Sequence, residues 1–552
     1  MKFKLPDIPE EEQTPVVKGL SSIVEQLIEH SQKQKEEIDV LKDEVRILKG
    51  QKKRPKFKPS KLDESTPIEP NEKSDEDEPA EESDDTCSSD KKGSGKPPKK
   101  SKKKRSNKKD LPIDREERVR PDNIPPGSRF KGYRDFHVQE LVIKRENVRY
   151  RLERWLTPDG QVLVGQLPTS LENRHYGSTL LTYLLYQHHH CQTTQPLLLE
   201  QLREWGIKMS AGQLNRLLSD NKSRFHDEKD GLLEVALTQA DYITVDDSGA
   251  RHKGKNGYVT HIGNEFFAWF SSTPSKSRVN FLTLLNGGEA SYRLSPEALQ
   301  YMREHKHKRV PRTLLNALAA SPVVEFADKE AWNKQLEQLN ITDERHIRIA
   351  TEGALIGALL HKGDVERIAI ISDGAGQFAV FQHGLCWVHA ERLIHTLLPM
   401  NDTHKVAVEL VREQIWALYS DLKLYKLNPC PKQAEAISKD FDDIFQQKTG
   451  YVTLDRALRR LNKLKSKLLL VLKRPEIPIH TNGSETDIRD YVKKRKVSGG
   501  TRSDLGQQCR DTFASLKKTC RKLGLSFWQY LKDRHHDNSI PPLPTILSEK
   551  LS

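Results

Sequence analysis

The spacing of apolar residues changes several times along the 552 residues of this chain, and each change predicts a different kind of element. In residues 20–48, apolar side chains recur at two alternating positions of a seven-residue repeat, as in a helix that pairs with another helix. Ser31 and Gln34 interrupt this seam, where polar groups can fix the register. We therefore expect a coiled-coil helix within residues 1–50. The pattern also fits an amphipathic helix that packs on its own chain.

Residues 51–128 have no such periodicity and are expected to form a linker. Residues 62–87 contain twelve acidic residues and one lysine, whereas residues 91–109 contain eleven basic residues and no acidic one. Neither block can bury enough apolar surface to offset the entropy of ordering, so both are expected to be disordered. The basic block could contact DNA phosphates, or it could pair with the acidic block.

Residues 129–237 are predicted to form a β-hairpin followed by a helical DNA-binding region. The hairpin is expected within 141–165, around a Pro-Asp-Gly turn. Residues 197–220 resemble a helix-turn-helix, in which one helix ends at Gly206 and Ser210 caps the next. Such a pair can place its second helix in a DNA groove, although other helical hairpins have the same pattern. The residues expected to reach DNA from this helix are Gln213, Asn215 and Arg216.

From residue 241 the apolar period changes to two, which predicts β-strands. The segments "DYITVDD", "GYVTHIG" and "EFFAWFSST" (241–273) are expected to form an antiparallel meander, with a loop at 248–256. A helix at 275–285 follows, and a later strand at 367–372 ends at Asp373.

This order predicts an α/β fold for residues 238–532, similar to the opening of a ribonuclease-H-like catalytic domain: three antiparallel strands, a helix and a further strand. In that fold the first and fourth strands are neighbours. Asp246 and Asp373 are therefore expected within a few ångströms of each other, although 127 positions separate them. The remaining expected segments are helical insertions at about 288–362 and 400–475, and a C-terminal tail at 533–552.

The net charge of the chain indicates which classes of partner it is expected to bind. The chain contains 91 lysines and arginines against 78 aspartates and glutamates, a net charge of +13. This favours a polyanionic partner, with nucleic acid ahead of a membrane surface. No apolar run is long enough to span a membrane, and the first residues lack the apolar core of a secretory signal, so no membrane association is expected. The six cysteines are scattered, which fits reduced thiols in the cytoplasm.

Aspartates at the ends of two neighbouring strands suggest phosphoryl transfer on nucleic acid. That reaction uses two hard cations about 3.5–4 Å apart, which a few carboxylates can hold. Beside Asp246 and Asp373, the best third candidate is Glu485, in the first turn of a helix that begins near Asn482. The alternative is structural: Asn482 and Glu485 have the spacing of a capping box, and Glu485 and Arg489 that of an ion pair.

Two basic segments follow these carboxylates and are candidates for holding DNA phosphates. One lies on the same predicted helix as Glu485, and the other lies in the loop after Asp246. Their ordinary alternatives are a solvated helix end and a charged hairpin loop. The candidate DNA-binding residues are Lys493, Lys494, Arg495 and Lys496 in the helix, and Arg251, Lys253 and Lys255 in the loop.

The segments "TVDDSGARHKGKNGYVTHIG", "ISDGAGQF", "CWVHAERLIH" and "TNGSETDIRDYVKKRKVSGGTRS" resemble those of bacterial transposases of the insertion sequence 66 family. The resemblance extends from about Arg129 to Lys532, and the heptad helix is similar to the N-terminal zipper of that family. It implies a transposase of the Asp-Asp-Glu type, in which Asp246, Asp373 and Glu485 are catalytic and bind metal.

The resemblance also implies supporting residues. Asp247 directly follows the first aspartate, Arg489 follows Glu485 by four positions, and Cys386 and His389 belong to the "CWVHAER" segment. We expect His389 to form hydrogen bonds near the carboxylates, with core packing and metal ligation as alternatives. Cys386 and His389 would form only half of a zinc site. The "HHHC" segment at residues 188–191 offers no better site, because its side chains would point in different directions on a helix.

We therefore expect an enzyme that binds element ends as double-stranded DNA, nicks them and joins their 3′-hydroxyl groups to target DNA, with two Mg²⁺ or Mn²⁺ ions. Pairing two ends requires at least a dimer, located in the cytoplasm with the nucleoid. Two alternatives stay open. A non-catalytic DNA-binding protein would lack the clustered carboxylates, and a ribonuclease-H-like nuclease would share the metals but not the joining of strands.

Overall fold

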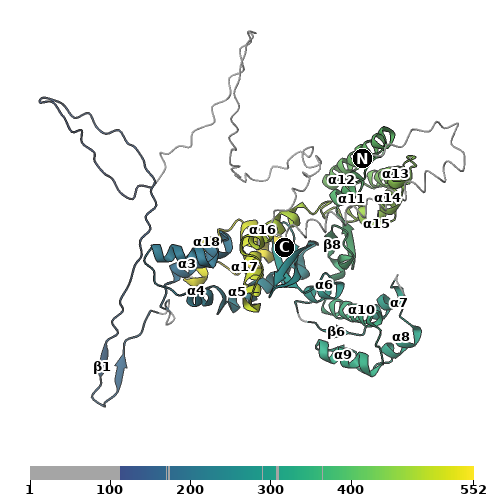
Figure 1. Cartoon of the computed structure of the whole chain (residues 1–552), viewed down its shortest axis with the longest axis horizontal. Coiled ribbons are helices and arrows are strands. Elements are labelled where there is room, and N and C mark those ends of the chain that lie inside the picture. The colour runs from purple at the N-terminus through teal and green to yellow at the C-terminus, as the bar shows by residue number, and fades with distance from the viewer. Residues whose placement is uncertain are drawn as a thin grey trace, which may run out of the picture. The chain divides into compact units, whose positions relative to one another are not determined.

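The structure is a computed structural model in which residues 112–168, 171, 175–288, 290–305, 310–363, 365–536 and 538–552 are described (Figure 1). The expected coiled coil and both charged blocks of the linker lie outside the described residues. Residues 112–148 belong to one compact unit, and the described residues from 149 onward belong to another. Between residues 112 and 148, all of which are described, there is no helix or strand.

The hairpin expected around the Pro-Asp-Gly turn is present and shorter than expected. β1 (Arg154–Leu156) pairs with β2 (Val162–Val164) in antiparallel register. Gly160 has a φ of +82°, and its N–H donates to the carbonyl oxygen of Thr157 at 2.9 Å. The glycine closes the turn because it adopts this left-handed conformation without steric cost.

Within the described residues, one mixed sheet contains five strands. They are β3 (Tyr242–His252), β4 (Lys255–Gly263), β5 (Ala268–Thr273), β8 (Ala369–Ser372) and β9 (Gln382–Leu385). The strand order is β5-β4-β3-β8-β9, with antiparallel pairs from β5 to β3 and parallel pairs from β3 to β9. The predicted meander is confirmed, as is the predicted pairing of its first strand with the strand before Asp373. β9 is an additional strand that the apolar pattern does not predict.

The prediction of a loop at residues 248–256 is wrong. β3 and β4 continue to His252 and Lys255, so the connection is only two residues long. Those residues, Lys253 and Gly254, have φ values of +48° and +76°. Two successive left-handed residues match the twist of paired antiparallel strands, which explains why a charged segment extends the hairpin.

Helices that precede and follow the sheet in the sequence pack together around it. The preceding ones are α2 (Ser178–Leu185), the π-helical turn η5 (Tyr186–His190), α3 (Gln195–Glu204), α4 (Ala211–Ser219) and α5 (Ser223–Gln239). The following ones are α16 (Asn482–Ser498), α17 (Asp504–Lys522), α18 (Phe527–His535) and α19 (Leu543–Leu551). α19 packs on α5, and its Leu543 and Leu547 are fully buried, so residues 533–552 are not a free tail.

The helix-turn-helix pattern is present as a helical hairpin formed by α3 and α4. The Ser210 side chain accepts from the Gln213 N–H, and the Gln213 side chain accepts from the Ser210 N–H, which completes a capping box. Gly206 lies in the turn with a φ of +72°.

α17 covers the outer edge of β5. The backbone N–H groups of Ala268, Phe270 and Ser272 donate to Thr519, Ser515 and Asp511, which are spaced one helical turn apart. The distances are 3.1, 2.9 and 2.7 Å. An open sheet edge invites pairing with other chains, and these side chains satisfy it within the fold.

Helices occupy both regions where insertions were expected: the first region separates β5 from β8, and the second follows β9. The first follows α6 (Arg278–Leu285) and contains β6 (Tyr292–Arg293), α7 (Pro296–Glu304), α8 (Arg312–Ala319), β7 (Glu325–Phe326), α9 (Lys329–Gln338) and α10 (Glu344–Lys362). The short turns η6 (Val365–Arg367) and η7 (Gly376–Phe378) flank β8. After α11 (Trp387–His395), the second contains α12 (Asp402–Leu427), α13 (Pro431–Gln446), α14 (Val452–Asn462), α15 (Lys465–Leu468) and η8 (Leu470–Leu472).

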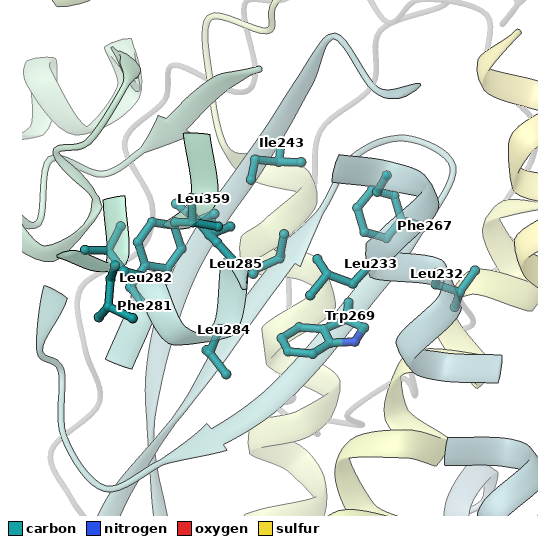
Figure 2. Packing of buried hydrophobic residues seen from close by; sticks show 14 of the residues in the cluster. Leu232, Leu233, Ile243, Phe267, Trp269, Phe281, Leu282, Leu284, Leu285 and Leu359 are labelled. Carbon is teal, nitrogen blue, oxygen red and sulfur yellow. The ribbon is translucent and has the colours of Figure 1, made fainter. Parts of the chain in front are cut away.

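A continuous apolar core joins the sheet to the helices on both sides of it in the sequence. Figure 2 shows Ile243 of β3 and Trp269 of β5 together with Leu232 of α5, Phe281 of α6 and Leu359 of α10. The second insertion forms a core of its own, which includes Ile371 of β8 and Trp387 of α11. The sheet is therefore held from several directions, and the C-terminal ends of β8 and β9 are fixed relative to α11.

Candidate functional site

The two aspartates predicted from strand ends are carried by the neighbouring parallel strands β3 and β8. Asp373 directly follows β8, whereas Asp246 lies within β3 and not at its end, because the hairpin extends β3 to His252. β3 and β8 pair in register through Thr244 and Ile371, and Asp246 and Asp373 each lie two residues beyond this pair. Because neighbouring strands are about 4.8 Å apart, the fold brings the two aspartates to adjacent places on the sheet.

Glu485 reaches the same region from the first turn of α16. The Ser484 hydroxyl donates to the Thr244 hydroxyl of β3 at 2.6 Å, and both side chains are buried. This bond fixes the start of α16 against the strand that carries the first aspartate. The helix that carries Glu485 and the strand that precedes Asp373 therefore both contact β3, which carries Asp246.

The capping-box alternative for Glu485 does not fit the structure. Thr481 is the N-cap residue and Asn482 is the first residue of the helix, so Asn482 and Glu485 do not occupy the two capping positions. The second half of the alternative is present, since Arg489 Nη2 lies 3.8 Å from Glu485 Oε2. Arg489 is largely exposed, so this ion pair contributes little to stability.

Asp246 has an unusual electrostatic environment. Burial raises its pKa, and the nearby charges of Asp373, Asp247 and Glu485 raise it further, although a hydrogen bond from the Asp247 N–H opposes the change. The result is a pKa of about 6. The carboxylates therefore repel one another, and this repulsion adds to the effect of burial in raising the pKa of Asp246.

Asp247 is held by hydrogen bonds to both of its carboxylate oxygens. Thr260 donates to Oδ1 at 2.6 Å and Gln377 donates to Oδ2 at 2.8 Å. Burial raises the pKa of Asp247, whereas these two hydrogen bonds lower it. Gln377 lies four residues after Asp373, so Asp247 links β4 to the segment that follows the second aspartate.

His389 lies beside the third carboxylate, as predicted. Its Nε2 is 3.5 Å from Glu485 Oε1, and Arg392 Nη1 is 4.0 Å from the same oxygen. Interaction with Cys386 raises the pKa of His389 despite burial. Burial raises the pKa of the Cys386 thiol, but His389 and Thr481 outweigh this effect and lower it. The His389–Glu485 contact favours the supporting position over plain core packing.

The donor set suits a hard cation, since carboxylate oxygens are the ligands that Mg²⁺ prefers. Asp246 Oδ1 accepts from the N–H of Asp247 at 2.7 Å, and Asp373 Oδ1 accepts from the N–H of Ala375 at 2.9 Å. With the side chains in these hydrogen bonds, no three acidic, histidine or cysteine groups of the described residues are arranged to share one metal ion. A bound cation would relieve the repulsion between Asp246 and the neighbouring carboxylates.

Arg278 is a contributor that sequence reasoning missed. From the first residue of α6, its Nη2 donates to the carbonyl oxygen of Gly376 at 2.6 Å, three residues after Asp373. Its Nη1 donates to Tyr301 at 2.8 Å and lies 3.3 Å from Glu352, which is buried in the first insertion. Arg278 thus connects that insertion to the turn after the second aspartate, and nothing in the local sequence distinguishes it from a surface arginine.

A second missed group anchors α16. Asp487 is buried, and Lys522 Nζ, His261 Nε2 and Lys518 Nζ lie 2.8, 3.3 and 3.6 Å from its carboxylate oxygens. Burial alone would raise the pKa of Asp487, but His261 and Lys522 lower it well below its usual range. These partners lie on β4 and α17, so the helix that carries Glu485 is fixed between them.

The candidate DNA-binding loop is the tight end of the β3–β4 hairpin. Arg251 and Lys255 are exposed, whereas Lys253 Nζ donates to Asp504 at 2.7 Å. The backbones of Lys253 and Thr501 are hydrogen-bonded at 2.8 Å. The hairpin is therefore docked on the segment after α16, and Arg251 and Lys255 present the accessible charges.

The basic run of α16 is divided between two environments. Lys493 and Lys496 are exposed, and Arg495 is half-buried with its guanidinium close to Gly249 of β3. Lys494 is buried, and its Nζ donates to the carbonyl oxygen of His188 at 2.6 Å. Burial and the nearby charges of Arg510 and Lys517 lower the pKa of Lys494 to about 7. Lys494 is therefore not placed at the surface, in contrast to the expectation for this run.

The candidate residues on α4 are also differently placed. Asn215 and Arg216 are exposed, and Asn215 Oδ1 accepts from Gln195 at 3.2 Å. Gln213 is occupied by the capping box. Of these three residues, Arg216 is thus the one whose side chain is both charged and exposed.

The "HHHC" segment has the divergent side chains that were expected. His189 stacks on Phe513 at a ring distance of 4.2 Å, whereas His188 bonds to the carbonyl oxygen of Thr193 at 2.9 Å. Separately, none of the described helices combines the length and the apolar character needed to cross a membrane.

Comparison with known proteins agrees with this arrangement. A model of the transposase IS66 family matches residues 368–509, a segment that contains Asp373, His389 and Glu485. The chain is also 43% identical, over 323 residues, to "Uncharacterized protein y4jO" of Sinorhizobium fredii (strain NBRC 101917 / NGR234). That match covers 58% of this chain and the whole of the relative. The chain belongs to the transposase IS66 family.

Proposed function

We propose that this chain is a transposase of the Asp-Asp-Glu type, which binds element ends as double-stranded DNA and catalyses strand cleavage and strand transfer. The observation that carries the proposal is the convergence of Asp246, Asp373 and Glu485 from three elements, with the resulting repulsion at Asp246. Groups with such perturbed ionisation gather at functional sites. Membership of a transposase family supports DNA as the substrate.

The sheet supports a ribonuclease-H-like catalytic domain over residues 238–532. Three antiparallel strands are followed by two parallel ones, and the first strand lies at the centre of the order. Asp246 lies on that central strand, and Asp373 directly follows its parallel neighbour. The helical region at 129–237 would bind DNA, although its core is continuous with that of the sheet.

Asp246, Asp373 and Glu485 would hold two Mg²⁺ or Mn²⁺ ions. When bound, such ions activate the attacking oxygen and stabilise the leaving oxygen of a phosphodiester. The chain's own residues position the ligands: Ser484 fixes the start of α16 on β3, and Gln377 joins Asp247 to the turn after Asp373.

DNA would be held by exposed cations around this site. Lys493 and Lys496 lie on the helix that carries Glu485, and Arg251 and Lys255 lie on the hairpin docked beside it. Arg489 is exposed next to Glu485 itself. We propose that the protein acts as at least a dimer with an N-terminal coiled coil at residues 1–50, and that it works in the cytoplasm at the nucleoid.

The test replaces each carboxylate by its amide: Asp246→Asn, Asp373→Asn and Glu485→Gln. Each change preserves shape and removes the charge that holds a cation. We expect cleavage of element-end DNA in Mg²⁺ to fall at least about a thousandfold, or about 4 kcal/mol, while DNA binding is retained. Asp443→Asn, at an exposed position of α13, is the matched control and should cleave normally.

Near-normal cleavage by Asp373→Asn would contradict the assignment. The products of the unaltered protein separate the alternatives. Joined strands support the transposase, nicks without joining indicate a nuclease, and binding without either indicates a non-catalytic DNA-binding protein.

A further inference from the structure

The long helix α12 has two apolar faces, and the residues that the structure describes cover only one of them. Its inner face packs into the core of the second insertion, against α11, α13 and η8. The large side chains on its outer face are between 52% and 78% exposed. The inner residues are Val408, Val411, Ile415, Leu418, Leu422 and Tyr425; the outer ones are Val406, Leu410, Leu424 and Leu427, with the exposed Ala417 between them.

The outer residues have the spacing of a helix-pairing seam. Starting at Val406, steps of four and three residues alternate through Leu410, position 413, Ala417, position 420 and Leu424 to Leu427. This is the seven-residue repeat that two helices use when they pack side by side. Only the two polar positions, Glu413 and Ser420, interrupt it. A surface helix that needs only one covered face has no reason to keep this second stripe.

The stripe is complementary to itself when two copies run in opposite directions. With Ala417 at the centre, Leu410 of one copy meets Leu424 of the other, and Val406 meets Leu427. The polar positions Glu413 and Ser420 also meet each other, so no leucine faces a carboxylate. The smallest residue stands at the crossing point, where close approach of two helices needs little side-chain volume. A two-fold axis through this point would give both copies the same contacts.

We propose that the outer face of α12 is an interface between two copies of this chain, with their α12 helices paired antiparallel around Ala417. The helix is 26 residues long, about 39 Å at 1.5 Å per residue, so the seam extends over three heptads. The pairing is separate from the proposed coiled coil at residues 1–50, and it does not depend on the proposed strand transfer.

Charges beside the seam favour this partner. In the antiparallel arrangement Glu409 of one copy is adjacent to Lys423 of the other, twice by symmetry. Within one copy, Glu409 pairs with Arg412 at 3.0 Å, and Lys423 lies over the Tyr419 ring at 5.4 Å, so both are positioned along the edge of the stripe. The exposed carboxylates Glu409 and Glu413 would repel DNA phosphates. A second copy therefore fits this face better than nucleic acid.

Cysteine cross-linking of the full-length chain tests the pairing and its direction. Ala417→Cys places two thiols against each other only at the two-fold axis, within the reach of a disulfide. Glu413→Cys, one helical turn away, would face Ser420 of the other copy. We expect mild oxidation to link Ala417→Cys dimers at least about tenfold faster than Glu413→Cys dimers. Equal rates would indicate parallel or random contact and would overturn the proposal, as would the absence of a link at 417.

A second set of variants asks whether the leucines hold the pair. In the Ala417→Cys protein, Leu410→Glu with Leu424→Glu should slow cross-linking at least about a hundredfold, because four apolar side chains per dimer become charged. Val323→Glu, an equally exposed apolar position in the first insertion, should leave the rate unchanged. Unchanged linking by the leucine variant would overturn the proposal, since another surface of this chain or another protein would then cover α12. Asp373→Asn should cross-link normally, which separates this test from that of strand cleavage.

Discussion

Two acidic residues of α16, Glu485 and Asp487, are separated by one position and meet opposite surroundings. Glu485 lies near Asp246 and Asp373, where burial raises the pKa of Asp246 to about 6 and the neighbouring carboxylates add to this effect. Asp487 points to β4 and α17; burial would raise its pKa, but His261 and Lys522 lower it. The same helix thus contributes Glu485 to a group of carboxylates that raise the pKa of Asp246, and Asp487 to a cluster in which basic side chains neutralise the buried charge.

The difference separates a reaction site from an anchor. A balanced buried cluster stabilises the fold as it is, and removing one member leaves charges without partners. An unbalanced cluster costs stability, so a protein keeps it only where something else is bound. Charge balance, rather than residue type, therefore assigns Asp487 to the frame and Asp246 to the proposed chemistry.

The largest expected effect on folding comes from the anchor. Asp487→Asn should lower the free energy of unfolding by about 3–5 kcal/mol, because Lys522 would lose its carboxylate partner and Lys518 would keep only Asp490. Urea denaturation measures this change, with Asp443→Asn as the exposed control. A decrease smaller than about 1 kcal/mol would mean that the cluster is not an anchor.

At the proposed reaction site, we expect that replacing an aspartate raises the free energy of unfolding instead of lowering it. Between about pH 4 and pH 6 the native protein keeps a proton on Asp246 that the unfolded chain has released, so stability falls as pH rises through this window. Asp246→Asn should therefore stabilise the protein at pH 7 by up to about 3 kcal/mol, and this gain should vanish below about pH 4. Urea denaturation at several pH values checks both statements. If Asp246→Asn destabilised the protein at pH 7, Asp246 would belong, like Asp487, to a cluster whose charges are neutralised.

The segment after Asp373 offers a smaller test. Arg278→Gln removes the donor to the Gly376 carbonyl, so the second aspartate should be held less firmly. If the proposed metal chemistry is correct, cleavage at low Mg²⁺ should fall about tenfold and recover at high Mg²⁺, because a misplaced ligand weakens metal binding. Arg345→Gln, at an exposed position of α10, is the control. A defect that high Mg²⁺ does not correct would indicate a purely structural role.

The smallest effect concerns the basic run on α16. Replacing Lys493, Arg495 and Lys496 by alanine should reduce the salt dependence of DNA binding by about 1–2 units of slope, roughly 0.9 for each phosphate that is no longer neutralised. Lys494→Met should leave the slope unchanged, since Lys494 is buried against His188. Titrations of a DNA duplex at several salt concentrations decide the matter. If both variants changed the salt dependence of DNA binding equally, the buried Lys494 would contact DNA phosphates as the exposed residues do.

The sequence alone predicted much of the candidate site. The strand end before Asp373 follows from local alternation, and the order of elements was enough to place its strand beside the one that carries Asp246. The predicted strand end at Asp246 was wrong, because β3 continues to His252. Glu485 followed from its position in the first turn of a helix and from the family resemblance. The strand pairing was predicted correctly because it depends on a topology with few alternatives, whereas the catalytic role of the three carboxylates stays a prediction.

Other features depended on the tertiary structure. The role of Asp487 depends on His261 and Lys518, which lie far away in the sequence, and that of Arg278 depends on the Gly376 carbonyl. A local pattern holds no information about such partners. In the same way, four consecutive basic residues cover every side of a helix, and only the docking of α16 decided which of them is buried. Periodicity and strand ends are properties of the chain itself, whereas the balance of charge around a carboxylate exists only after distant elements have packed together.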